Sequence, residues 1–142
     1  MIRPASIVRF ERLYLAGLAL GIINIVLNWS ATAHAIAAQP ALTSVAGWYQ
    51  PAATLVGVAI PLLLWYTIAR RGSRVAKWIL TVWTALAVFG LLGGLATGHM
   101  VDGIVGVLGV VTILLDVVAV WTLFRPDTRA WFGETVVSDT LP

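Results

Sequence analysis

The first half of the chain contains one long uncharged stretch, residues 13–69, which reads LYLAGLALGIINIVLNWSATAHAIAAQPALTSVAGWYQPAATLVGVAIPLLLWYTIA. A transmembrane helix needs about 20 apolar residues, because each residue rises about 1.5 Å across roughly 30 Å of hydrocarbon. This stretch is therefore long enough for two crossings. Its middle, residues 30–50, contains Ser, Thr, His, Gln and Pro, so we predict spans over about residues 13–29 and 51–69.

The second half repeats this layout with a shorter connection. Two more apolar runs predict spans over about residues 78–97 and 103–124, with a tight turn between them and Pro126 ending the last one. The predicted fold class is all-α, a polytopic membrane protein whose four transmembrane helices form one bundle. We expect residues 1–133 to form this single domain and residues 134–142 to be a mobile cytoplasmic tail.

The composition excludes an ordinary soluble domain. Hydrophobic residues make up 60% of the 142-residue chain and charged residues only 11%, whereas soluble proteins carry about 25% charged residues. The lipid bilayer is therefore the expected partner of most of the surface. The chain has no cysteine, which excludes disulfides, thiolate metal sites and cysteine nucleophiles.

The basic residues indicate how the chain is oriented. All nine Lys and Arg residues fall into three clusters at the amino-terminal end, between the second and third spans, and after the fourth span: Arg3, Arg9 and Arg12; Arg70, Arg71, Arg74 and Lys77; Arg125 and Arg129. Cytoplasmic flanks of transmembrane helices are enriched in Lys and Arg, so both termini are predicted to be cytoplasmic. Clusters that interrupt apolar runs do not form a basic face, so no nucleic-acid partner is expected.

The amino-terminal segment also resembles a cleavable signal peptide, with a basic start and a small-residue motif at Ala33-His34-Ala35. Its apolar run is longer than the usual 7–15 residues, so we expect a retained first span. Residues 4–12 are expected to begin this helix early, with Ile7 and Phe10 facing lipid. At the other end of the chain, Trp131 and Phe132 are expected to dip into the headgroups.

Small residues gather on one side of each predicted span, as helical spacing shows. Helices in lipid associate through small residues that let their backbones approach. We expect most of these stripes to pack the bundle internally, whereas the third span, with its two overlapping GxxxG patterns, is the best candidate for joining protomers or a partner. The candidate packing residues are Gly17, Gly21, Gly90, Gly94, Gly98, Gly106 and Gly109. Trp83, inside the same span, is expected to fill the core.

Asp116 is the one formally charged residue within a predicted span. A carboxyl in the membrane is costly and is a functional candidate by default, although a neutral Asp hydrogen-bonded to another helix is an equally reasonable interpretation. Asn24 lies at a comparable depth, which permits an Asn24–Asp116 contact but does not establish that the two residues face each other. The candidate intramembrane polar site consists of Asn24, Asn28, Thr84, Thr112 and Asp116.

Few residues suggest metal or catalytic chemistry. His34, His99 and Asp102 could together hold zinc, but nothing in the sequence brings the two connecting segments together, so polar turn residues are the preferred interpretation. No phosphate loop, dinucleotide fingerprint, HExxH motif or nucleophile elbow is present. We therefore predict no catalytic residues, no cofactor and no metal, and a protein that is not an enzyme.

Two flanking segments resemble those of small, uncharacterised four-span proteins of the bacterial inner membrane: FERLYL at residues 10–15 and RPDTRAWF at residues 125–132. The resemblance implies the bacterial inner (cytoplasmic) membrane as the location and implies no activity.

The predicted function is non-catalytic. We expect a small integral membrane protein that packs as a homo-oligomer or as an accessory subunit of a larger membrane complex, because its polar extramembrane regions are small and its helices carry glycine faces. The alternative is a small proton- or cation-linked transporter or channel that uses Asp116 and Asn24.

Overall fold

The computed structural model describes residues 3–41, 44–98 and 103–134, and these residues are helical with no strand. The helices are α1 (Ala5–Leu27), α2 (Trp29–Ala37), α3 (Ala46–Arg71), α4 (Arg74–Thr97) and α5 (Gly103–Thr122), followed by a 3₁₀ turn, η1 (Pro126–Thr128). Of these, α1, α3, α4 and α5 are long and apolar enough to cross a membrane. The prediction of an all-α chain with four such helices is confirmed. The predicted turn at residues 98–102 and the expected tail at residues 134–142 lie almost wholly outside the described residues.

The helices differ from the predicted spans mainly in the first half of the chain. Helix α2 was not predicted, because its Ser, Thr and His residues lower the hydropathy of the segment without preventing helix formation. Alternate residues of α2 are alanine, which has the highest helix propensity. Helix α3 begins at Ala46 and continues through Pro51 and Pro61, whereas the predicted span began at Pro51.

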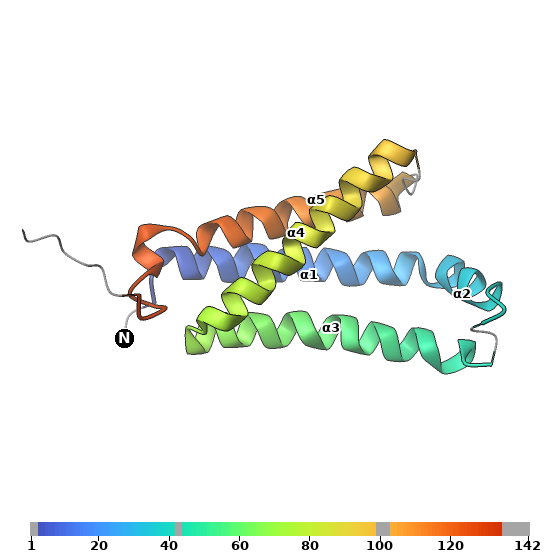
Figure 1. The fold of residues 1–142 in the computed structure, drawn as a ribbon, viewed down its shortest axis with the longest axis horizontal. Coiled ribbons are helices and arrows are strands. Elements are labelled where there is room, and N and C mark those ends of the chain that lie inside the picture. The colour runs from blue at the N-terminus through green and yellow to red at the C-terminus, as the bar shows by residue number, and fades with distance from the viewer. Residues whose placement is uncertain (1–2, 42–43, 99–102, 135–142) are drawn as a thin grey trace, which may run out of the picture.

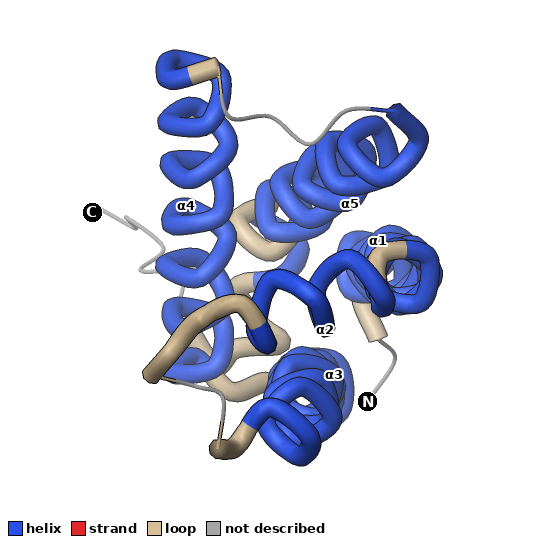
Figure 2. The backbone as a smooth tube through the Cα atoms, turned by 90° about the vertical axis from the view of Figure 1, so that its right-hand side faces the viewer, coloured by secondary structure: helices blue, strands red, loops and turns tan. Residues whose placement is uncertain are grey.

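Helices α1 and α5 form the centre of the bundle as an antiparallel pair (Figure 1). Helix α3 packs against α1, and α4 contacts α3 and α5 but not α1. The view along the bundle shows α2 lying across the end where α3 begins (Figure 2). Small residues of α1 set its register against α5. If Gly17 carried a Cβ, this atom would lie 3.1 Å from Asp116 Oδ1, and a Cβ on Gly21 would lie 3.8 Å from Thr112 Cγ2.

The hydrophobic core lies at one end of the bundle, where the start of α1, the α3–α4 connection and the segment after α5 meet. We call this the basic end, because it carries the three clusters of Lys and Arg. Ile7 and Phe10 are 0% exposed there, so the expectation that they face lipid is wrong. The reason is that the chain after α5 turns back and covers this part of α1, as the contact between α1 and η1 shows.

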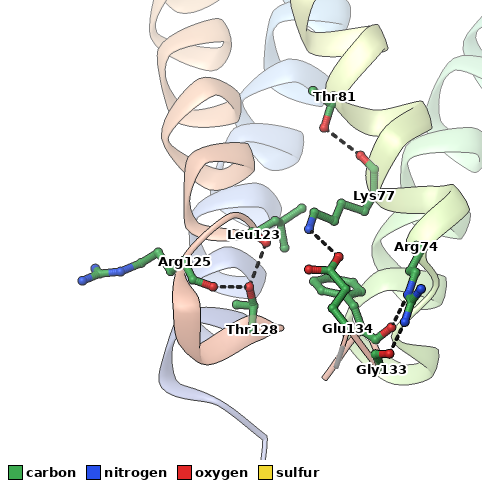
Figure 3. Close-up of polar contacts among 9 residues, drawn as sticks. Arg74, Lys77, Thr81, Leu123, Arg125, Thr128, Gly133 and Glu134 are labelled. Carbon is green, nitrogen blue, oxygen red and sulfur yellow. Dashed lines mark hydrogen bonds and ion pairs between the residues drawn. The ribbon is translucent and has the colours of Figure 1, made fainter. Parts of the chain in front are cut away.

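Residues 125–134, which we call the C-terminal clasp, fasten this end (Figure 3). Arg74 donates hydrogen bonds to the carbonyls of Phe132 and Gly133, and Trp131 Nε1 donates to the Ile68 carbonyl at 3.0 Å. Phe132 is 4% exposed, so its expected place among the headgroups is wrong. Sequence hydropathy could not distinguish a ring buried in protein from one buried in lipid.

Lys77 is the most buried charged residue at this end, with 4% of its surface exposed. Its Nζ lies 3.2 Å from Glu134 Oε1 and within 4.4 Å and 4.8 Å of the ring centres of Phe124 and Phe132. A buried ammonium needs such partners, because an unpaired charge in the protein interior is strongly destabilising. The clasp therefore supplies the anion, Glu134, and one of the two rings, Phe132, that keep Lys77 buried, and Phe124, just before the clasp, supplies the other ring.

The clasp also contacts the start of α1. Ser6 Oγ donates to Asp127 Oδ1 at 2.7 Å, and the Ser6 backbone N–H donates to Asp127 Oδ2 at 3.2 Å. The hydrogen bond from the Ser6 hydroxyl holds the pKa of Asp127 below its usual range, because it stabilises the ionised carboxylate. Glu11 joins α1 to α3 in the same region through an ion pair with Arg70 at 3.3 Å.

Candidate functional site

The opposite half of the bundle is more open than the basic end. Helices α3 and α4 lie close together at their connection, and α4 then crosses toward α5, so the two helices diverge (Figure 1). In this half lies a cavity of about 590 Å³ between α1, α2, α3 and α5, which we call the large cavity. Its polar lining comes from all four helices and includes Asn24, Asn28, Thr32, Gln50, Thr54 and Thr112.

A second cavity of about 150 Å³, the small cavity, lies nearer the basic end. Tyr14, Trp83 and Asp116 are among its lining residues. The two cavities share Gly21, Ile25, Gly57 and Thr112, so they adjoin along the α1–α3–α5 interface. We call these two adjoining cavities the connected cavities, and Asp116 lines the small one, farther from α2 than the large one.

Asp116 is packed against α1 but has little polar contact. A Cβ at Gly17 would lie 3.1 Å from Asp116 Oδ1, so a side chain at this position would make the carboxyl shift by a few tenths of an ångström. Within the part of the chain that the structure describes, no hydrogen bond to this carboxyl is present. Lining a cavity, the carboxyl is therefore placed to accept a proton, a cation or water.

The contact between Asn24 and Asp116 that their comparable depth permits is not formed. Asn24 Nδ2 donates instead to the Val105 carbonyl at 2.9 Å and lies beside Gly109, 3.6 Å from the position of an added Cβ. In the antiparallel register Gly17 lies opposite Asp116, and Asn24 lies opposite Gly109. Gly109 is about two helical turns from Asp116 along α5, so Asn24 lies opposite a different part of α5. Depth matching along the bilayer normal could not reveal this register.

Two threonine hydroxyls have no hydrogen-bond partner among the described residues, although both oxygens are buried: Thr84 Oγ1 and Thr112 Oγ1. A buried polar group without a partner is costly, and such groups commonly bind water or a ligand. Thr112 lines both cavities, whereas Thr84, on α4, lines neither. Of the five predicted polar residues, Asn24, Asn28, Thr112 and Asp116 thus border the connected cavities, and Thr84 is set apart.

Sequence reasoning missed part of the site. Gln50, buried on α3, donates from Nε2 to the Trp29 carbonyl at 3.0 Å, and the Tyr14 hydroxyl donates to the Pro61 carbonyl at 3.3 Å. Helical spacing places Gln50 on the same face as Thr54 and Gly57, so the polar stripe of α3 continues one turn before the predicted span. The prediction ended that stripe too early because it placed Gln50 in a loop.

The predicted packing glycines lie in two different environments. Gly17, Gly21 and Gly109 lie at the α1–α5 contact, whereas positions for a Cβ on Gly90 and Gly98 have no atom within 4 Å. Gly94 and Gly106 line a cleft of about 280 Å³ between α4 and the α1–α5 pair.

Trp83 lies on the exposed side of α4 and is 51% exposed, so the expectation that it fills the core is wrong. Helix α4 leans away from α1, which leaves this face of α4 at the edge of the small cavity.

The zinc hypothesis concerns mostly undescribed residues. His34 is exposed, and its Nδ1 lies 2.8 Å from the Ser30 carbonyl. His99 and Asp102 lie outside the described residues, and within those residues no group of three potential metal ligands is present.

In comparisons with protein-family models, curated proteins and solved structures, nothing matches this chain. Its function is therefore inferred from the cavities and the helix faces.

Proposed function

We propose that the chain is a multi-pass protein of the bacterial inner membrane whose basic end lies in the cytoplasm. The positive-inside rule supports this orientation, because all nine Lys and Arg residues belong to segments at that end. Contacts between Ser6 and Asp127 and between Arg74 and Phe132 hold these segments together. The resemblance of residues 10–15 and 125–132 to segments of bacterial inner-membrane proteins supports the location.

Single cysteines at Ser44 and Ala130 test the orientation in this cysteine-free chain. Both residues are exposed, and they lie at opposite ends of the bundle, because Ser44 precedes the start of α3 and Ala130 belongs to the clasp. A membrane-impermeant thiol reagent added to intact cells is expected to label position 44 and not position 130. Ala130 is a better cytoplasmic probe than Ser73, whose hydroxyl caps α4 by accepting from the Ala76 N–H. Labelling of position 130 in sealed cells would reverse the proposed orientation.

The function proposed for this membrane protein is non-catalytic: it packs with copies of itself or joins a larger membrane complex as an accessory subunit. The observation that carries this proposal is the uncovered side of α4. Gly90, Gly93 and Gly98 have no atom within 4 Å of a Cβ position, and Gly90 lines the open cleft between α4 and the α1–α5 pair. Close approach of another helix at such a face gives packing energy that lipid chains do not supply.

Gly90→Leu tests this proposal. The new side chain enters the open cleft between α4 and the α1–α5 pair, so the fold is expected to persist while a helix that packs into this cleft is excluded and association through α4 is lost. Ala85→Leu, an equally exposed position on another face of α4, is the matched control and is expected to leave association unchanged. Light scattering in mild detergent gives the mass, and cross-linking in native membranes gives the association before extraction. Equal masses and cross-links for both variants and the unmodified chain would refute association through this face.

A second candidate function is a small proton- or cation-linked transporter or channel. The specific observation in its favour is the connected polar space between α1, α3 and α5, which places Asn24 and Thr112 between the α2 end of the bundle and Asp116. An ionisable residue that borders a cavity within a transmembrane bundle commonly marks an ion or substrate pathway.

A further inference from the structure

The lining of the connected cavities contains an acidic side chain but no basic side chain among the described residues. Asp116 is an acidic residue there, and among the described residues that line either cavity there is no Lys, Arg or His. The other polar atoms are hydroxyls and side-chain amides, including the Thr112 hydroxyl, which has no partner. A site with a carboxyl and no competing basic group favours a positively charged occupant.

Aromatic rings accompany the carboxyl. Tyr14 on α1 and Trp83 on α4 line the small cavity together with Asp116 on α5. Ring faces attract cations, and Trp and Tyr are the rings that recognise organic ammonium groups most effectively. The Tyr14 hydroxyl is already engaged with the Pro61 carbonyl, so the side chain is held in place beside the cavity.

The size of the space argues against a bare inorganic ion as the whole occupant. The large cavity has a volume of about 590 Å³, which is within the range of about 300–1,000 Å³ typical of pockets for small organic molecules. Ile25, Ile36 and Ile113 contribute apolar walls beside the polar groups. The lining therefore suits an occupant with an apolar body as well as a charge.

We propose that the connected cavities bind an organic monocation of the ammonium type. Its charged head lies in the small cavity beside Asp116, Tyr14 and Trp83, and its apolar body lies in the large cavity. The inference rests on the second candidate function and names the substrate class for it. Binding uses the carboxylate form of Asp116, so the cation competes with a proton, and a proton displaced from the carboxyl passes to water.

The test uses the full chain in lipid nanodiscs and benzyltrimethylammonium as the probe. Calorimetry is expected to show saturable binding that weakens at least tenfold in Asp116→Asn and weakens as the pH falls. Asp116→Glu keeps the charge and is expected to retain binding. Asp127→Asn, which removes a carboxyl of the basic end instead, is the matched control and is expected to bind as the unmodified chain does.

A second variant tests the place of binding. Gly57 lines both cavities and has no atom within 4 Å of a Cβ position, so the side chain of Gly57→Leu starts in open space and is expected to fill the junction of the cavities. It is expected to abolish probe binding while circular dichroism and gel filtration remain unchanged. Full binding by folded Gly57→Leu or Asp116→Asn would overturn the proposed site. Equal affinity for neopentylbenzene, the uncharged isostere of the probe, would show that the space takes neutral apolar molecules and would overturn the substrate class.

Flux measurements separate this inference from the function on which it rests. Proton or sodium flux into liposomes that stops in Asp116→Asn, with no probe binding by the folded chain, would refute the organic cation and leave the second candidate standing. Failure of both binding and flux would refute both.

Discussion

Alanine at position 72 is expected to lower the free energy of unfolding by roughly 3 kcal/mol, or to prevent the C-terminal clasp from docking. Gly72 has a φ of 59°, which is unfavourable for a residue with a side chain. In addition, an added Cβ would lie 2.4 Å from the Trp131 carbonyl oxygen, which is a backbone atom. The α3–α4 connection and the clasp would have to separate, and the bond from Trp131 to the Ile68 carbonyl would be lost with them.

Gly98→Ala provides the matched control. Gly98 ends α4 with a φ of 66°, close to that of Gly72, but has no atom within 4 Å of a Cβ position. Its substitution pays only the conformational cost, about 1 kcal/mol. Unfolding of both variants by sodium dodecyl sulfate in mixed micelles, followed by tryptophan fluorescence, measures the difference. Equal losses would mean that the clasp does not dock closely on residue 72.

The second large effect is expected for Gly17→Leu, which should destabilise the bundle by about 3 kcal/mol through overpacking. A Cβ at position 17 already lies 3.1 Å from Asp116 Oδ1 and 3.5 Å from Leu115 Cβ, so a leucine side chain would press on the Asp116 carboxyl and on α5. Helices α1 and α5 would move apart along their contact, and the small cavity would lose its shape.

Ala16→Leu is the control for this substitution, because Ala16 is exposed and lies about 100° around α1 from Gly17. It adds an apolar side chain to the same turn of α1 and is expected to change stability by less than about 0.5 kcal/mol. Detergent unfolding of the two variants side by side gives the comparison. If Ala16→Leu proved as disruptive as Gly17→Leu, the α1–α5 contact would have to lie on a different face of α1.

Hydropathy and length were sufficient to predict the four long helices, because an apolar run of about 20 residues is a strong signal. The same signal could not predict how the basic end is built. Ile7, Phe10 and Phe132 are apolar residues beside a span, and burial against protein and burial in lipid leave the same pattern in the sequence. Only the return of the clasp over α1, which depends on long-range bonds such as Ser6 to Asp127, distinguishes the two.

The candidate site was predictable in composition but not in arrangement. Helical spacing identified Asn24, Thr112 and Asp116 as inward-facing residues, because few polar residues occur in the spans. Their partners depend on the register of α1 against α5, which Gly17 and Gly21 set through close contacts. Tyr14 lies near the end of a predicted span, and the sequence could not show that its hydroxyl joins α1 to α3.

The way in which α4 is held has a mechanical consequence. Arg74 and Lys77 fasten its first turn to the clasp, while its far end contacts neither α1 nor the clasp. A rod of 24 residues is about 36 Å long, so a tilt of about 5° at the fastened turn moves the far tip by about 3 Å. The helix is therefore a lever pivoted at Lys77, and a small rearrangement of the clasp is magnified at its far tip, whereas Trp83, about 9 Å from the pivot, moves by less than about 1 Å.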